Sequence, residues 1–174
     1  ENPAGFRFCG SCGAEFVAES PIREVRKTVT VVFTDISGST ELGERLDPEA
    51  LRRGLAEYFA EIRRIIERHG GTVEKFIGDA AMAIFGIPVA QEDDALRAVR
   101  AVAEIRDRLT ELGEARSLRL SFRTGVNTGQ VVTGDGETLA TGDAVNVAAR
   151  LEQAAVPGEI LIGDATLALV RNAV

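Results

Sequence analysis

Two aspartates stand where the chain leaves predicted strands. Asp35 ends the apolar run TVTVVFTD, residues 28–35, and Asp79 lies in the Gly-Asp turn of GTVEKFIGDAAMAIFG. If both strands belong to one sheet, the two carboxylates meet at its edge, where they repel each other unless a cation lies between them. Such oxygen ligands suit divalent metals, and two metal ions are the usual clamp for in-line attack at phosphorus. Each aspartate alone has an ordinary alternative, as a helix cap or as a turn residue.

The segment ISGST, residues 36–40, follows Asp35 directly. Its glycine and hydroxyl side chains precede a predicted short helix, whose free N–H groups can bind phosphate oxygens. Together with the aspartates, this segment predicts a site for metal ions and a phosphate.

Three further polar residues have informative spacings. Asn146 and Arg150 are four residues apart in the predicted helix GDAVNVAARLEQAA, so they share a helix face and can reach a common ligand. The alternative is a solvated face with a surface salt bridge. Lys75 alternates with Val73 and Ile77, which predicts all three on one strand face and argues against a strand-edge solubility charge.

The hydropathy pattern supplies the elements that position these residues. Their order is a strand over 28–35, a helix over 47–70 with Asp47 as its cap, a hairpin over 71–86, a helix over 92–112 ended by Gly113, two strands around NTGQ (127–130), a helix capped by Asp143, a strand over 158–163 and a helix over 164–174. The first strand, helix, hairpin, helix and fourth strand predict an α+β, ferredoxin-like βαββαβ core with appended strands and helices.

Composition excludes several classes of protein. The chain is 45% hydrophobic and 27% charged, as in soluble globular domains. Its net charge of -7 argues against a nucleic-acid partner. No apolar run approaches the roughly 20 residues of a membrane span, and no secretory signal is evident. We therefore expect a cytoplasmic location and no membrane span.

The two cysteines lie together near the N-terminus. Cys9 and Cys12 in CGSCG have the spacing of a zinc knuckle but supply only two of four ligands. Residues 1–26 resemble the second half of a short zinc ribbon followed by a linker, so we expect a structural Zn²⁺ in a longer protein whose other ligands lie upstream. The alternative is a flexible or oxidised tail.

Four motifs resemble one family in that family's order. VVFTDISGSTEL, EKFIGDAAMAIFG, RTGVNTGQVVTG and GDAVNVAARLEQA are similar to successive motifs of the class III adenylyl/guanylyl cyclase catalytic domain. The resemblance implies such a domain over residues 27–174. It also implies that Asp35, Asp79 and the main-chain carbonyl of Ile36 bind two Mg²⁺ or Mn²⁺ ions. The implied triphosphate contacts are Ser37, Gly38, Ser39, Thr40 and Arg123.

The same resemblance assigns the remaining site residues. Asn146 would orient the ribose and Arg150 would stabilise the pentavalent phosphorus, while Lys75 would bind the purine. Leu139 stands where the family usually places an Asp or Thr that reads the base, and leucine offers no hydrogen bond. Base choice then depends on Lys75, backbone and shape, with Thr138 or Thr141 as substitutes if their loop shifts register. We expect ATP rather than GTP as substrate.

The implied reaction is attack of the ribose 3'-hydroxyl on the α-phosphorus, which yields a 3',5'-cyclic nucleotide and pyrophosphate. By the family's arrangement the aspartates of one chain face Lys75, Asn146 and Arg150 of a second, so a homodimer is expected. The alternative is a catalytically silent nucleotide-sensing or dimerising module, favoured by Leu139 and by the lack, after Val174, of the further strands that the family usually has. A diguanylate cyclase is disfavoured because no GGDEF-like turn occurs.

Overall fold

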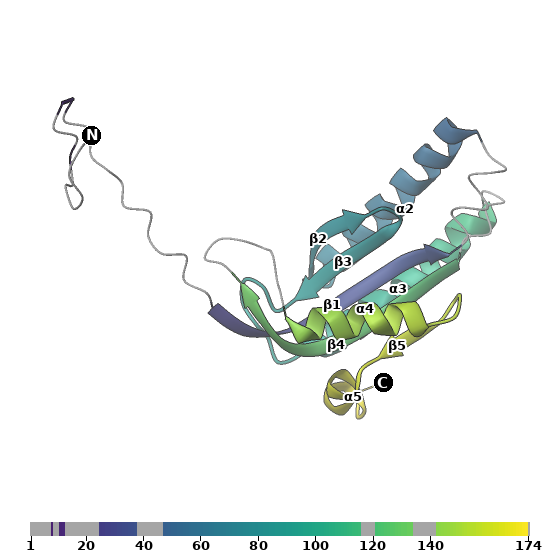
Figure 1. Ribbon diagram of the computed structural model, residues 1–174. Coiled ribbons are helices and arrows are strands. Elements are labelled where there is room, and N and C mark those ends of the chain that lie inside the picture. The colour runs from purple at the N-terminus through teal and green to yellow at the C-terminus, as the bar shows by residue number, and fades with distance from the viewer. Residues whose placement is uncertain are drawn as a thin grey trace.

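The computed structural model describes residues 8, 11–12, 25–37, 47–115, 121–133 and 142–173. Its centre is a five-stranded sheet with the order β2-β3-β1-β4-β5 (Figure 1). The strands are β1 (Val25–Ser37), β2 (Thr72–Ile77), β3 (Ala80–Phe85), β4 (Ser121–Thr133) and β5 (Ile160–Ile162). All neighbours are antiparallel except β4 and β5, which are parallel. The order β4-β1-β3-β2 is that of a ferredoxin-like core, so the predicted α+β fold is confirmed.

Helices cover both faces of this sheet. They are α2 (Pro48–Arg68), α3 (Asp94–Ala115), α4 (Asp143–Ala154) and α5 (Asp164–Val170). Helices α2 and α3 lie on one face and α4 lies on the other, over β1 and β4 (Figure 1). The start of α2 is capped as predicted, since the Glu49 N–H donates a hydrogen bond to Asp47 Oδ2 at 3.1 Å.

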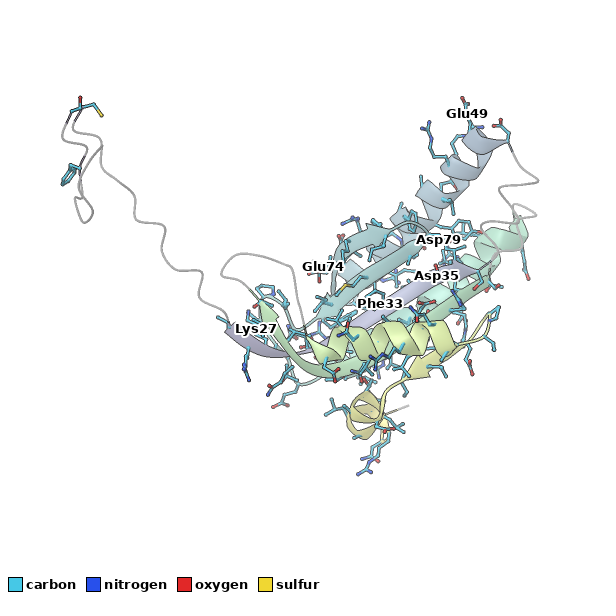
Figure 2. All side chains as sticks on the ribbon, in the orientation of Figure 1. Lys27, Phe33, Asp35, Glu49, Glu74 and Asp79 are labelled. Carbon is cyan, nitrogen blue, oxygen red and sulfur yellow. The ribbon has the colours of Figure 1, made fainter. Side chains whose placement is uncertain are left out.

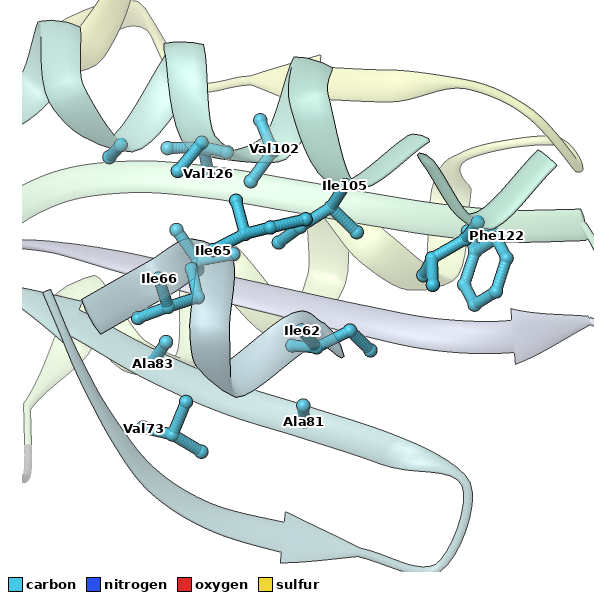
Figure 3. Close-up of a cluster of buried hydrophobic side chains, with 14 of the residues drawn as sticks. Ile62, Ile65, Ile66, Val73, Ala81, Ala83, Val102, Ile105, Phe122 and Val126 are labelled. Atoms are coloured by element: carbon cyan, nitrogen blue, oxygen red, sulfur yellow. The ribbon is translucent and has the colours of Figure 1, made fainter. Parts of the chain in front are cut away.

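Strand β1 buries both of its faces. Val32 and Ile36 join the core under α2 and α3, whereas Val29 and Val31 join a second cluster under α4. Because alternate side chains of a strand point to opposite faces, a run of β-branched residues fills both layers. Figure 3 shows the larger cluster, in which Ile62, Ile65 and Ile66 of α2 meet the sheet. The apolar run of the sequence therefore identified a central strand correctly.

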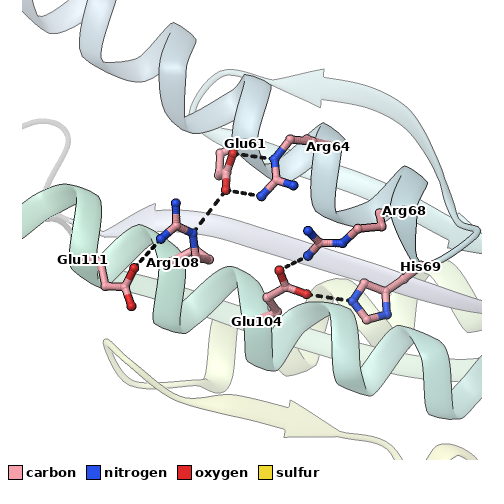
Figure 4. Close-up of polar contacts among 7 residues, drawn as sticks. All are labelled: Glu61, Arg64, Arg68, His69, Glu104, Arg108 and Glu111. Atoms are coloured by element: carbon pink, nitrogen blue, oxygen red, sulfur yellow. Dashed lines mark hydrogen bonds and ion pairs between the residues drawn. The ribbon is translucent and has the colours of Figure 1, made fainter.

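Polar contacts also join α2 to α3 at the surface. Glu61 of α2 pairs with Arg64 at 2.6 Å and with Arg108 of α3 at 3.5 Å (Figure 4). Further along, Glu104 of α3 pairs with Arg68, and its Oε2 accepts a hydrogen bond of 2.9 Å from His69 Nε2. Exposed pairs of this kind contribute little to stability, so the buried side chains between the helices carry most of the packing energy.

Three boundary predictions are wrong. The residues NTGQ do not form a turn, because β4 continues through them and pairs with β1 over its whole length, Val25–Ser37. Helix α3 passes through Gly113 and ends at Ala115. Asp143 lies in the first turn of α4, and the cap position is Gly142, which makes no side-chain capping bond.

The glycines of β4 mark a close helix approach rather than a turn. A Cβ placed on Gly125 would lie 2.2 Å from the Ala148 carbonyl oxygen and 2.4 Å from the Glu152 amide nitrogen of α4. A Cβ on Gly129 would lie 2.9 Å from the Ala144 Cβ. Turn glycines and contact glycines look alike in sequence, which explains the wrong prediction.

Most of the predicted zinc segment lies outside the described residues. Cys9 is among those not described, and Cys12 is exposed with a free thiol. Across the described ranges, no helix combines the length and apolar character needed to cross a bilayer. The zinc site and the domain boundary at residue 26 stay predictions.

We predict that Gly125→Ala lowers the free energy of unfolding by about 1–3 kcal/mol, because backbone atoms of α4 must move to make room. A loss of stability would indicate the close contact with α4, since Gly→Ala in an unconstrained strand raises stability by roughly 0.5–1 kcal/mol. Urea denaturation followed by circular dichroism measures the change. Gln130→Ala, at an exposed position of the same strand, is the control and should be close to neutral. Unchanged or higher stability in Gly125→Ala would contradict the close approach.

Candidate active site

The two predicted aspartates lie close together at the end of the sheet where β1 finishes and β3 begins. Asp35 is paired with Ala80, the first residue of β3, and Asp79 occupies the turn just before it. The Ile36 N–H donates a hydrogen bond of 3.4 Å to the Asp79 carbonyl oxygen. Figure 2 shows Asp79, in the turn between β2 and β3, next to Asp35 near the end of β1. The central position of β1 thus brings together residues far apart in the sequence.

Arg123 lies directly opposite Asp35 in the register of β4. Its Nη2 contacts the Asp35 carboxylate and also lies 3.1 Å from Oε1 of Glu152 in α4. The hydrogen bond from Arg123 to Asp35 raises the pKa of the guanidinium against the effect of burial, and the charges of Glu152, Asp35 and Asp79 raise it further. Arg123 therefore stays charged beside these carboxylates.

Glu152 is a site residue that the sequence motifs did not predict. Its side chain is only 10% exposed. Burial raises the pKa of Glu152, Arg123 opposes that rise, and the charges of Asp35 and Asp79 add to it. A signal was present in the sequence, because Glu152 follows Ala144 and Ala148 at intervals of four residues. A charge within such an apolar stripe is unusual unless it has a partner.

Several polar atoms of this site have unused hydrogen-bonding capacity. Ser37 Oγ, Arg123 Nε and Glu152 Oε1 are buried and make no hydrogen bond within the described part of the chain, although Glu152 Oε1 has the ion pair with Arg123. Buried polar atoms normally find partners. Their grouping around Asp35 fits a site built for a polar ligand or for ordered water.

Lys75 is exposed on the face of the sheet that carries Asp35. It reaches this face through a register shift in β2, not through the predicted alternation with Val73. Val73 pairs with Ala83, whereas Lys75 pairs with Met82, because the register shifts between them. Ala83 belongs to the core under α2 and α3, and Met82 to the cluster on the opposite face. The prediction that Val73 and Lys75 share a face is therefore wrong, and the irregularity turns Lys75 outward.

Asn146 and Arg150 share the exposed side of α4. Ala144, Ala148 and Glu152 face the sheet and are buried. A separation of two residues in an α-helix is about 200°, so Asn146 and Arg150 project from the side of α4 opposite Glu152. Within one chain, the structure does not bring this pair together with Asp35 and Asp79.

Some predicted site residues lie outside the described ranges. They are Gly38, Ser39, Thr40 and Leu139. Ser37 and Ile36, at the end of β1, mark where the predicted phosphate-binding segment begins.

The donors present suit hard divalent cations. Within the described residues there is no group of three or more His, Cys, Asp or Glu side chains that could hold a metal. A cation at Asp35 and Asp79 would therefore need further oxygen ligands, such as the Ile36 carbonyl, substrate or water. The guanidinium of Arg123 against Asp35 shows that this position already stabilises positive charge. The two carboxylates thus fit the predicted metals.

Comparison with known proteins defines the class of this fold and site. Residues 23–173 match the family model of the adenylate and guanylate cyclase catalytic domain. The chain belongs to this family, as the motifs indicated.

Similar proteins include both kinds of cyclase. Adenylate cyclase 1 of Rhizobium meliloti is 36% identical over 137 residues, covering 73% of this chain and 21% of that protein. The crystal structure of the adenylyl cyclase CyaB from P. aeruginosa is 37% identical with a TM-score of 0.81, covering 87% of this chain and 84% of that one. The crystal structure of the guanylyl cyclase Cya2 is 34% identical with a TM-score of 0.76, covering 83% of this chain and 79% of that one. The chain thus spans a small part of its full-length relative.

We predict that Asp35→Asn lowers the pKa of Glu152. The variant removes a negative charge that raises this pKa and leaves Arg123 to pair with Glu152 alone. Carboxyl-carbon NMR titration measures the shift, and Asp143→Asn, at an exposed position of α4, is the control. A Glu152 pKa that does not move would show that the two carboxylates are not coupled.

The same raised pKa sets the sign of a pH effect on stability. Glu152 binds its proton more tightly in the folded chain than in the unfolded chain, where its pKa is near 4.5. The stability that this tighter proton binding contributes is fully present below pH 4.5 and is lost as the pH rises through the pKa of Glu152 in the folded chain. The Glu152→Gln variant has no titrating group at this position. The difference between its unfolding free energy and that of the wild type, variant minus wild type, should therefore increase as the pH rises from 4.5 through the pKa of Glu152 in the folded chain.

Proposed function

We propose that this domain is a nucleotidyl cyclase that converts ATP to 3',5'-cyclic AMP and pyrophosphate. The observation that carries the proposal is the convergence of Asp35 and Asp79, beside the cationic Arg123, at the edge of a cyclase-family sheet. Similar proteins named adenylate or adenylyl cyclase support ATP as the substrate, and the likeness to a guanylyl cyclase makes GTP the competing substrate to test.

The reaction we propose is intramolecular. The ribose 3'-hydroxyl gives its proton to solvent water, and its oxygen bonds to the α-phosphorus. The bond from that phosphorus to the bridging oxygen of the β-phosphate breaks, which releases pyrophosphate. Two Mg²⁺ or Mn²⁺ ions held by Asp35, Asp79 and the Ile36 carbonyl would make the hydroxyl more acidic and neutralise the leaving group.

The protein's own side chains bind and orient the nucleotide in this proposal. Arg123 and the segment from Ser37 to Thr40 hold the triphosphate, and Lys75 contacts the purine. Asn146 orients the ribose, while Arg150 supplies positive charge where it builds up on the phosphoryl oxygens. The buried, unsatisfied Ser37 Oγ and Arg123 Nε support a polar ligand at this position.

The site we propose lies between two copies of the chain. Asn146 and Arg150 project from the exposed side of α4, away from Asp35, so one chain presents two half-sites rather than one complete site. Two-fold pairing would place the α4 pair of each copy against the aspartates of the other and form two equivalent sites.

Complementation tests the shared site. Asp35→Ala and Arg150→Ala should each be inactive alone, but a refolded equimolar mixture should recover roughly a quarter of wild-type activity, because half of the dimers are mixed and each has one intact site. Cyclic nucleotide formation is the measurement.

The matched control mixes Asp35→Ala with Asp79→Ala. Both changes damage the same half-site, so no mixed dimer contains an intact site and no activity should return. Equal behaviour of the two mixtures would contradict a site shared between chains.

Direct product analysis tests the activity and its substrate. Purified protein with Mn²⁺ should form cyclic AMP from ATP, and with GTP it should form product with at least a tenfold lower kcat/KM, a difference of about 1.4 kcal/mol in transition-state binding. Chromatography of the nucleotide products measures both. Nucleotide binding without product would instead favour the silent sensing module.

A further inference from the structure

Arg123 makes two contacts that compete for one guanidinium. Its Nη2 contacts Asp35 and also lies 3.1 Å from Glu152 Oε1. Asp35 is a proposed metal ligand, and a cation arriving there would be next to the positive charge of Arg123. Like charges at such short range repel strongly in a partly buried site. A cation at Asp35 therefore weakens the contact between Arg123 and this carboxylate.

Glu152 is the side chain positioned to receive the guanidinium of Arg123. The two carboxylates approach Arg123 from different elements, Asp35 from β1 and Glu152 from α4. Arg123 Nε and Glu152 Oε1 are both buried and make no hydrogen bond within the described residues. A small movement of the guanidinium away from Asp35 could use this capacity in a two-point contact with Glu152.

If position 152 had only a structural role on the buried side of α4, a small apolar residue would be favoured there over glutamate. Glu152 occupies a helix position whose equivalents one and two turns earlier are Ala148 and Ala144. A buried carboxylate there costs more than a small apolar side chain unless it has a function or a strong partner. Its only ion-pair partner in the described part of the chain is Arg123.

We propose that Glu152 is a positioning residue that takes Arg123 from Asp35 when a divalent cation binds, and so opens the metal site. In the metal-free chain Arg123 is shared and acts as the internal counter-ion of Asp35. In the metal-bound chain Glu152 holds Arg123 at the edge of the site, in reach of the triphosphate. This proposal rests on the metal site of the proposed function.

Direct binding of Mn²⁺, without nucleotide, tests the proposal through the electron paramagnetic resonance signal of the free ion. Glu152→Gln should weaken Mn²⁺ binding about tenfold, because Arg123 then stays on Asp35. Arg123→Gln should tighten binding, because Asp35 no longer has an internal counter-ion. Glu152→Asp, which keeps the carboxylate, should restore part of the loss.

The double variant separates this mechanism from simple charge attraction. If Glu152 acts through Arg123, adding Glu152→Gln to Arg123→Gln should leave Mn²⁺ affinity unchanged. If Glu152 attracts the cation directly through space, the second change should weaken binding as much as it does alone, which would overturn the proposal. Asp143→Asn controls for net charge, and circular dichroism confirms that each variant is folded.

The outcomes also distinguish this inference from the proposed function. Wild-type affinity in Glu152→Gln overturns the role of Glu152 but leaves cyclic nucleotide formation to be judged by the product assay. Unchanged Mn²⁺ binding in Asp35→Asn would place the ions elsewhere and overturn both the metal site and the role of Glu152.

Discussion

Strand β1 lies in the middle of the sheet, paired along its whole length with β4 and, over its second half, with β3. This double pairing is the constraint on which the site depends. It places Asp35 beside the turn that holds Asp79 on one side and opposite Arg123 on the other. Because strand pairing fixes neighbours to within a residue, residues 35, 79 and 123 become adjacent although long segments separate them. Figure 1 shows this strand crossing the molecule between its neighbours.

Charge balance decides how these side chains are arranged. Asp35 and Glu152 are largely buried, and each contacts the same guanidinium. One Arg123 is thus shared between two carboxylates, with the charge of Asp79 also acting on it. Among the described side chains, the carboxylates of Asp35, Asp79 and Glu152 act on the single guanidinium of Arg123. Carboxylates in excess of their counter-ions are stabilised by a cation or a proton. Burial is the main cause of the raised pKa of Glu152, and the charges of Asp35 and Asp79 add to it.

Helix α4 links the site to the proposed second subunit. Its sheet-facing side consists of alanines and Glu152, and the contact is close because β4 has glycines beneath it. The opposite side carries Asn146 and Arg150 toward solvent. A helix that is held so closely on one side presents its other side in a fixed orientation. The precision that a shared catalytic site needs can therefore come from packing within each chain.

The sequence by itself determined the fold class, the central strand, the Gly-Asp hairpin turn and the family, because these depend on local hydropathy, turn chemistry and ordered motifs. Only the tertiary structure decided which faces the side chains occupy. The register shift that turns Lys75 outward, the glycines that admit α4 and the burial of Glu152 all arise from neighbouring elements. Local periodicity contains no information about a partner distant in the chain, so a contact glycine resembles a turn glycine and a buried glutamate resembles a surface one.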